Sequence, residues 1–489
     1  MAKRTAVIDI GSNSIRLVIY EKTSRFAFHL IQEVKSRVRI GENSYLNNSN
    51  ITAEAMQTAY DALNEFKTIC ISNKVQKTLC IATSALRDAP NKSIFINRIK
   101  KDLNINIKVI SGEKESYFGA LSCSSLLPKS SAITVDIGGG STEFAIIDNA
   151  NIVKTMSLNL GTVRLKELFF DNDDIDGAIE YIDNELLQLG SISHTHIMGI
   201  GGTFRTLSSI ILDSSAYPLD KIHGFNFSSK TLFKYIDKIL SSNENQLKEL
   251  GVKKERFDVI KPGVLILMRV AKYLSTDTLT CSGVGVREGV FLADLLRNSN
   301  HKFPNNFNTS LKSLQDKHCE QPRYTNMLAK VCKNLFELLH VELQIESQHL
   351  NSLTTAAKLS KIGGSLHFYS LHQHSYYLIQ SALEYGYTHQ ENVLISTLVR
   401  FQKRRLPSSE HYEKYKTLLP NIETLNVLSF ILSLSDTLLI HQPRNIDFEL
   451  KFEENTVKII SKEKMHLAKE RAALLKTPKK LNIEFVELS

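Results

Sequence analysis

The first three hundred residues alternate short apolar runs with longer amphipathic stretches. The runs Thr5 to Ile8, Lys77 to Ala82 and Asn106 to Ile110 have the length and aliphatic content of strands. Between the first two, Ala53 to Ser72 repeats apolar residues at helical spacing. This alternation is typical of an α/β architecture.

The pattern changes after Asn298. Residues 298–309 are rich in Asn, contain a Pro and hold few aliphatic residues, which is typical of a linker. Beyond the linker, helical spacing dominates, and short apolar runs return only near the end of the sequence. The predicted elements are helices at 326–339, 352–362, 376–383 and 421–439, a hairpin at 446–452 and 457–460, a helix at 464–475 and a strand at 481–486.

A strand, Gly-rich turn and strand occur twice in the first part of the chain. Val7 to Ser14 is matched by Val135 to Thr142, and each segment is followed by another aliphatic run. Gly and Ser in such a turn allow backbone N–H groups to point at an anion. Two copies predict two similar half-domains that face one cleft.

Two further Gly clusters, Gly199 to Thr203 and Gly283 to Gly289, follow later in the same region. The sequence contains no G-x-x-x-x-G-K-[ST] pattern, and neither hairpin copy is a G-x-G-x-x-G that opens a helix. P-loop and Rossmann folds are therefore disfavoured. The predicted domains are 1–125, 126–300, 310–440 and a small α+β tail at 441–489.

Composition and charge limit which cellular compartments and which binding partners are compatible with the sequence. The chain has 489 residues and a net charge of +9, so its field attracts polyanions without selecting one class. Asp9 interrupts the first apolar run, so this run is not the unbroken apolar segment that a secretory signal needs. The apolar stretch 425–440 is too short and too polar to span a bilayer. Six scattered cysteines fit a reducing compartment. A cytoplasmic protein without a membrane partner is expected.

The ordered series of motifs resembles the exopolyphosphatase and guanosine pentaphosphatase family, a branch of the sugar kinase and actin superfamily. The likeness runs from about Ala6 to Leu296. It implies an α/β fold of two ribonuclease H-like, actin-like ATPase domains facing a cleft, then a mostly α, degenerate HD-like domain. The motifs are Asp9 to Ser14, Ala82 to Arg87, Ile110 to Glu115, Asp136 to Glu143, Gly199 to Thr203 and Arg287 to Gly289.

The resemblance also implies roles for individual residues. Glu115 matches the carboxylate that activates water, and Arg87 matches an arginine that grips phosphate. Asp136 and Glu143, with Asp9 facing them, would hold Mg²⁺ directly or through water. The loops that would bind phosphate oxygens contain Gly11, Ser12, Asn13, Ser14, Gly138, Gly139, Gly140, Ser141, Gly201, Gly202 and Thr203.

Several of these residues also have a purely structural interpretation. Asp9 and Asp136 can cap turns, and Glu113 is an alternative to Glu115 two residues away. Arg87 can form a surface ion pair with Asp88, and Arg287 can pair with Glu288.

The HD-like part lacks the ligands of an active metal site. Leu359 to Gly363 stands where His-Asp would be needed, and the nearby His367, His372 and His374 show no recognisable ligand spacing.

The resemblance implies hydrolysis of the terminal phosphate of inorganic polyphosphate, of guanosine pentaphosphate, or of both, with Mg²⁺ as cofactor. It also implies a cytoplasmic homodimer and no nucleic-acid partner. An actin-fold kinase or ATPase is an alternative that would require an adenosine pocket and an acceptor base. A non-catalytic regulator that binds guanosine alarmones is another, although it has no need of a water-activating carboxylate.

Overall fold

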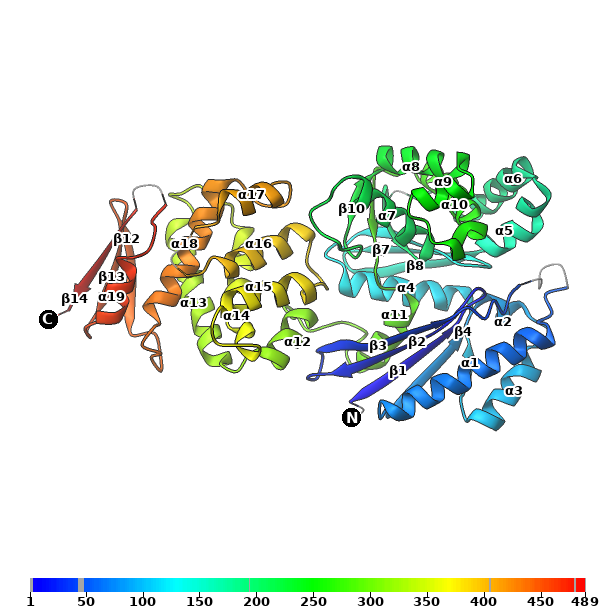
Figure 1. Cartoon of the computed structure of the whole chain (residues 1–489), viewed down its shortest axis with the longest axis horizontal. Coiled ribbons are helices and arrows are strands. Elements are labelled where there is room, and N and C mark those ends of the chain that lie inside the picture. Colours follow the sequence, from blue (N-terminus) through cyan, green and yellow to red (C-terminus); the bar gives the residue numbers. More distant parts are fainter. Residues whose placement is uncertain (1–2, 43–47, 193, 404–405, 479–480, 489) are drawn as a thin grey trace. The chain divides into compact units, whose positions relative to one another are not determined.

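The computed structural model describes residues 3–42, 48–192, 194–403, 406–478 and 481–488. The chain forms two compact units, Met1–Phe307 and Asn308–Ser489 (Figure 1). The first unit contains two lobes, each built on its own sheet.

Lobe I is a five-stranded sheet in the order β3-β2-β1-β4-β5, with helices α1, α2 and α3. The first three strands are antiparallel, and the last two run parallel to β1. Leu63 and Phe66 of α1 and Phe95 of α3 share a core with Ile8 and Ile10 of the sheet. The bounds are β1 (Arg4–Ile10), β2 (Ile15–Lys22), β3 (Phe28–Ser36), β4 (Lys77–Ala82), β5 (Ile107–Val109), α1 (Ala53–Ser72), α2 (Ser84–Asp88) and α3 (Lys92–Leu103).

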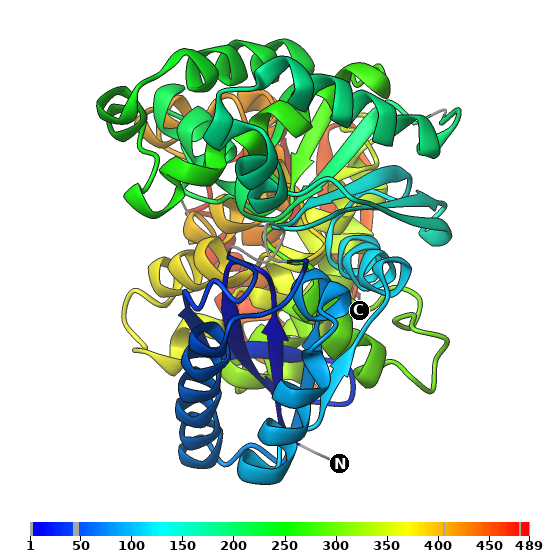
Figure 2. The ribbon, with the colours of Figure 1, turned by 90° about the vertical axis from the view of Figure 1, so that its right-hand side faces the viewer.

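Lobe II repeats this topology. Its sheet has the order β10-β11-β9-β6-β7-β8, so without the edge strand β10 it matches lobe I strand for strand. The bounds are β6 (Ala132–Ile137), β7 (Thr142–Asp148), β8 (Asn151–Leu158), β9 (His196–Ile200), β10 (Asn226–Ser228), β11 (Thr278–Cys281), α5 (Thr162–Leu168), α6 (Ile175–Leu186), α7 (Gly202–Ser214), α8 (Ser229–Ser241), α9 (Glu244–Glu249) and α10 (Phe257–Tyr273). The predicted pair of ribonuclease H-like domains is confirmed (Figure 2).

The two lobes exchange their last helices. Helix α4 (Gly112–Leu126) follows the sheet of lobe I but packs its Ala120 and Cys123 into the core of lobe II. Helix α11 (Val286–Leu295) follows the sheet of lobe II but stacks Phe291 on Tyr20 of lobe I, with ring centroids 4.4 Å apart. Each helix therefore ties one lobe to the other and brings its first turn into the space between them.

The second unit is mostly helical, as predicted. Its helices are followed by a three-stranded sheet in the order β12-β13-β14, which confirms the predicted hairpin and last strand. The sequence pattern missed α12, α16 and α17. In α16, residues 392–399 are all buried, including the polar Asn392, Ser396 and Thr397, so polar positions do not mark an exposed face. The bounds are α12 (Thr309–His318), α13 (Pro322–Leu339), α14 (His349–Leu359), α15 (Leu371–Ala382), α16 (His389–Arg400), α17 (Ser409–Tyr415), α18 (Ile422–Leu438), β12 (Phe448–Glu453), β13 (Thr456–Ser461), α19 (His466–Ala472) and β14 (Asn482–Glu487).

The degenerate HD position of this unit contains a lysine. Lys361 places its Nζ 2.7 Å from Oδ1 of Asp436, and the Tyr324 hydroxyl donates to the same oxygen at 2.6 Å. Burial alone would raise the pKa of Asp436, but the Lys361 ammonium and these hydrogen bonds hold it below its usual value. One carboxylate of α18 therefore joins Tyr324 of α13 and Lys361, which follows the end of α14.

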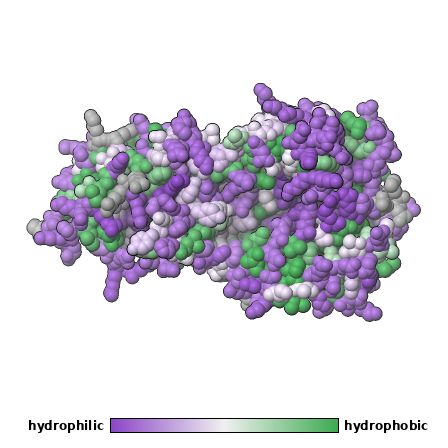
Figure 3. All heavy atoms as spheres, in the orientation of Figure 1, coloured by the Kyte–Doolittle hydropathy of each residue, from purple (hydrophilic) through white to green (hydrophobic). Residues whose placement is uncertain are grey.

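The face of the molecule drawn in Figure 3 is largely hydrophilic. Figure 3 shows hydrophobic residues as separate groups among hydrophilic ones on the face in view. Within the described ranges, no helix has both the length and the apolar character needed to cross a membrane.

Substituting Gly289 tests the crossing of the exchanged helices. A Cβ at Gly289 would lie 1.8 Å from the backbone oxygen of Phe118, and a backbone atom cannot move aside as a flexible side chain can. We expect Gly289→Ala to lower the free energy of unfolding by about 2–3 kcal/mol in urea denaturation. Gly364→Ala is the control, because its Cβ would meet only Leu371 Cδ1 at 3.4 Å. Equal stability of the two variants would contradict the close crossing.

Substituting Lys361 tests the buried ion pair. Without the ammonium, Asp436 is a buried carboxylate lacking its cation, so Lys361→Met should destabilise the second unit by about 2 kcal/mol at pH 7. In the wild type, ionised Asp436 contributes to the free energy of unfolding above about pH 4, and this contribution is lost as the pH falls and the carboxylate is protonated. The variant raises the pKa of Asp436 above its unfolded value, so it should gain stability from pH 7 to pH 5. Calorimetry of the full chain measures both trends, with Lys333→Met as the exposed control.

Candidate active site

The two Gly-rich turns have the same geometry and face each other. In lobe I the Gly11 amide donates to the Ser14 carbonyl at 3.1 Å, and in lobe II the Gly138 amide donates to the Ser141 carbonyl at 3.0 Å. A Cβ on Gly139 would lie 3.0 Å from Cβ of Ser12. The turns therefore approach so closely that a larger residue at Gly139 would separate them.

A polar cavity lies between the turns. Most of the predicted residues line it, and they come from both lobes and from the first turn of α4. The remaining four, Arg87, Gly140, Glu143 and Thr203, lie just behind its wall. The predicted residues in the lining are Asp9, Gly11, Ser12, Asn13, Ser14, Glu115, Asp136, Gly138, Gly139, Ser141, Gly201 and Gly202.

The two carboxylates of lobe II both have raised pKa values. Asp136, one residue before the end of β6, is paired in register with Glu143 of β7. Burial raises the pKa of Asp136 to about 6, with the charge of Asp9 adding to the rise and Arg205 opposing it. Burial and the charge of Asp136 raise the pKa of Glu143 to about 7, although Ser157 donates a hydrogen bond to it at 2.9 Å. The site therefore holds acidic groups close together, an arrangement that favours either a proton or a bound cation.

The corresponding pair in lobe I has a different charge. Asp9 of β1 is paired in register with Arg16 of β2, at the position where lobe II has Glu143. Burial raises the pKa of Asp9, while Arg287 and Arg16 oppose the rise. The duplicated fold therefore carries an asymmetric site, in which one hairpin presents two acids and the other an acid and a cation.

Glu115 enters the cavity from the first turn of α4. The Ser111 side chain caps this helix by accepting from the Lys114 amide. Burial, followed by the nearby charge of Glu143, raises the pKa of Glu115 well above its usual value, and Arg87 opposes the rise. The alternative residue Glu113 is exposed and is not part of the cavity lining.

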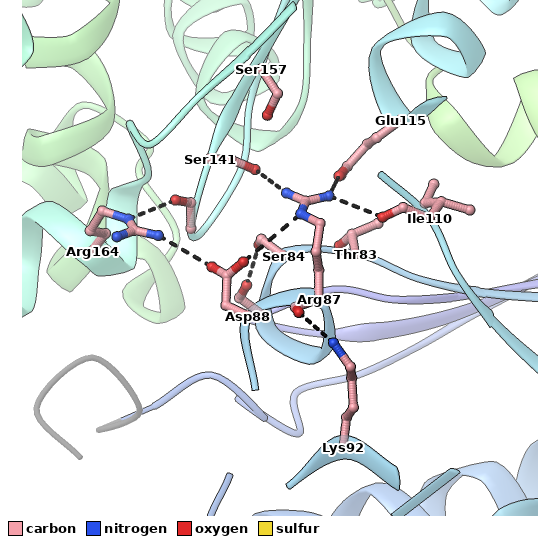
Figure 4. A network of polar contacts seen from close by, with 12 residues as sticks. Thr83, Ser84, Arg87, Asp88, Lys92, Ile110, Glu115, Ser141, Ser157 and Arg164 are labelled. Atoms are coloured by element: carbon pink, nitrogen blue, oxygen red, sulfur yellow. Dashed lines mark hydrogen bonds and ion pairs between the residues drawn. The ribbon is translucent and has the colours of Figure 1, made fainter. Parts of the chain in front are cut away.

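Arg87 connects three elements behind the cavity wall (Figure 4). Its Nη1 donates to Oε2 of Glu115 at 3.0 Å and to the Ile110 carbonyl at 3.3 Å, and its Nη2 donates to Oγ of Ser141 at 3.2 Å. Its Nε is 3.9 Å from Asp88, so Glu115 is the closer acidic partner. The expected grip of Arg87 on phosphate stays a prediction.

Arg287 and Glu288 form their hydrogen bonds with different partners. Arg287 lines the cavity and bonds Glu33 at 3.0 Å. Glu288 accepts from the Gly285 amide at 2.7 Å and from the Tyr20 hydroxyl. Arg287 therefore faces the cavity, and Glu288 holds α11 against lobe I.

The sequence interpretation missed a cluster of arginines at the cavity. Arg16 and Arg205 line it, and Arg256 lies against Gly202 with an Nε that has no hydrogen-bond partner among the described residues. Burial lowers the pKa of Arg256 to about 10, and the charges of Arg205 and Arg16 lower it further. Like charges held this close favour an anionic ligand.

Two signals could have revealed part of this cluster. The tight hairpin fixes Arg16 opposite Asp9, and Arg205 lies in the first turn of a helix that begins after a Gly-rich loop. Gly201 in that loop has a φ of +95°, and a Cβ there would lie 2.8 Å from Oδ1 of Asp136. Arg256 gave no local signal, because it reaches Gly202 only through the packing of α10.

The lobes and the site define an actin-like fold whose interlobe cavity combines anion-binding turns, carboxylates and arginines. Residues 18–298 match the Ppx/GppA phosphatase family, and residues 308–483 match domain III of the Ppx/GppA phosphatases. The chain belongs to the Ppx/GppA phosphatase family, and so to the phosphate-releasing hydrolases.

Known relatives cover most of the chain. It is 28% identical to the guanosine-5'-triphosphate,3'-diphosphate pyrophosphatase of Vibrio campbellii over 420 residues, which is 82% of this chain and 81% of the relative. It is 31% identical to the bifunctional 3-dehydroquinate synthase/phosphatase of Fusobacterium nucleatum over 57% of this chain, and spans only 44% of that protein. The crystal structure of an exopolyphosphatase from Cytophaga hutchinsonii aligns whole with 61% of this chain, at 28% identity and a TM-score of 0.57.

Removing one arginine tests the anion site. Arg205→Met should weaken tripolyphosphate binding about tenfold, because a charge-assisted hydrogen bond contributes about 1.5 kcal/mol. Isothermal titration calorimetry measures the dissociation constant, with Lys234→Met on the outer helix α8 as the control. An unchanged constant in Arg205→Met would exclude Arg205 from the anion site.

Proposed function

We propose that the chain hydrolyses the terminal phosphate of a linear phosphate chain, either inorganic polyphosphate or guanosine pentaphosphate. The observation that carries this proposal is the position of Glu115. Its buried carboxylate lines the same cavity as the two Gly-rich turns and three arginines, Arg16, Arg205 and Arg287. The names of the relatives, a guanosine pentaphosphate hydrolase and an exopolyphosphatase, support the same substrate class.

In this mechanism the protein holds the phosphate and activates water. The backbone N–H groups of the two turns and the arginines bind the oxygens of the terminal phosphate. Glu115 orients a water molecule in line with the leaving oxygen and takes its proton at a carboxylate oxygen. Arg87 fixes the rotamer of Glu115 through the 3.0 Å hydrogen bond. The raised pKa of Glu115 makes it a stronger base than an exposed carboxylate.

Asp136 and Glu143, with Asp9 opposite, fit a magnesium ion. Among the described residues, no three His, Cys, Asp or Glu side chains form a ready-made metal cage. Mg²⁺ does not need one, since it commonly binds one or two carboxylates together with water and phosphate oxygens. Burial raises the pKa values of both acids, the charge of Asp9 adds to the rise at Asp136, and the charge of Asp136 adds to the rise at Glu143; a bound dication would relieve crowded negative charge of this kind. When bound, Mg²⁺ would neutralise charge on the phosphate oxygens.

The contrast between Glu115 and Glu113 tests the proposal. Glu115→Gln should lower kcat for phosphate release about a thousandfold, because the general base is lost while the shape is kept. Glu113→Gln is the matched control on the same helical turn and should retain the wild-type rate. Release from polyphosphate and from guanosine pentaphosphate, each with Mg²⁺ and with EDTA, gives the substrate preference and the metal dependence. An active Glu115→Gln variant would overturn the assignment of the base.

A further inference from the structure

The phosphate-binding turn of lobe II rests on the first turn of α5. The amides of Thr162 and Val163 donate to the carbonyls of Gly138 and Gly139 at 3.0 and 2.8 Å. The Arg164 side chain adds to this support, because its Nε donates to the Gly140 carbonyl at 2.9 Å. The turn and α5 therefore form one body within lobe II.

The same arginine also reaches the other lobe. Nη2 of Arg164 donates to Oδ2 of Asp88 at 3.3 Å, and Asp88 is the last residue of α2 in lobe I (Figure 4). Its neighbour Arg87 binds Glu115 and Ser141. Helix α2 is thus joined to the lobe II turn by two parallel connections, Arg87 to Ser141 and Asp88 to Arg164.

The second connection lies outside the substrate space. Neither Arg164 nor Asp88 lines the cavity between the Gly-rich turns. Their side chains are partly exposed, at 16% and 32%. An ion pair of this exposure is weak and screened by salt, so it can adjust the position of the turn without being needed for the fold.

We propose that the Arg164–Asp88 bridge is a positioning contact between the lobes, which holds the turn Gly138–Ser141 in register with Arg87 and Glu115. When the bridge is broken, the turn and the base still exist, but their mutual distance is no longer fixed. Misplacement of this kind slows the chemical step more than it weakens binding, because the ligand still meets the same amides and arginines. The kinetic part of this inference rests on the proposed hydrolysis.

The first test separates kcat from KM. Arg164→Met and Asp88→Asn should each lower kcat for phosphate release about tenfold with KM within about twofold. The double variant should lose less than the product of the two single losses, because both variants remove the Arg164–Asp88 contact, although Arg164→Met also removes the hydrogen bond to Gly140 and Asp88→Asn also weakens the pair with Arg87. Arg164→Lys keeps the charge and should recover most of the rate. Asp102→Asn, which removes the exposed pair with Arg98 on α3, should leave both constants unchanged.

Three kinetic results would overturn the proposal. A raised KM at constant kcat would mean that Arg164 contacts substrate. Multiplicative losses in the double variant would mean that the two residues act separately. Unchanged kinetics in Arg164→Met and Asp88→Asn would mean that the bridge does nothing.

A second test needs no substrate. Hydrogen exchange of peptides covering residues 84–88 and 138–141 should be faster in both Arg164→Met and Asp88→Asn than in wild type, and unchanged in Asp102→Asn. If wild type releases no phosphate, the proposed function fails, and this comparison alone still decides whether the bridge orders the turn. Equal exchange in all four proteins would overturn it.

Discussion

The hydrogen bond between Arg87 and Glu115 is the contact on which the rest of the site depends. Glu115 is a buried carboxylate with a raised pKa, and Arg87 is its counterion at 3.0 Å. The same guanidinium donates to Ser141 of the opposite lobe. One side chain therefore holds the proposed base and links it to the Gly-rich turn of lobe II. A lysine could not do both, because it lacks the planar fork.

Duplication followed by divergence explains the charge pattern. The two sheets have the same topology, and Asp9 and Asp136 end equivalent strands. Their register partners differ, with Arg16 in one lobe and Glu143 in the other. A symmetric pair of acidic hairpins would repel a polyphosphate, and a pair of basic ones could not hold a cation beside it. The asymmetry places both acidic and basic groups at one cavity, as the proposed binding of a polyanion together with a dication would require.

The sequence predicted the parts of the site that lie in local motifs. The Gly-rich turns, Asp136 and Glu115 could be found because each follows a strand and stands in a recognisable order. Arg256 and the bridging role of Arg164 could not, since they depend on how α10 and α5 pack. The exchange of α4 and α11 likewise depends on tertiary packing, because the sequence of an amphipathic helix does not determine which sheet the helix covers.

The central claim is that water attacks the terminal phosphorus of a chain held between the lobes. Hydrolysis of each substrate in water enriched in oxygen-18 tests it most directly. The account predicts one labelled oxygen in each released orthophosphate and none in the shortened chain, as read by phosphorus NMR. Incorporation of the label into the shortened chain, or transfer of the phosphoryl group to an acceptor without incorporation of label, would contradict attack of water on the terminal phosphorus.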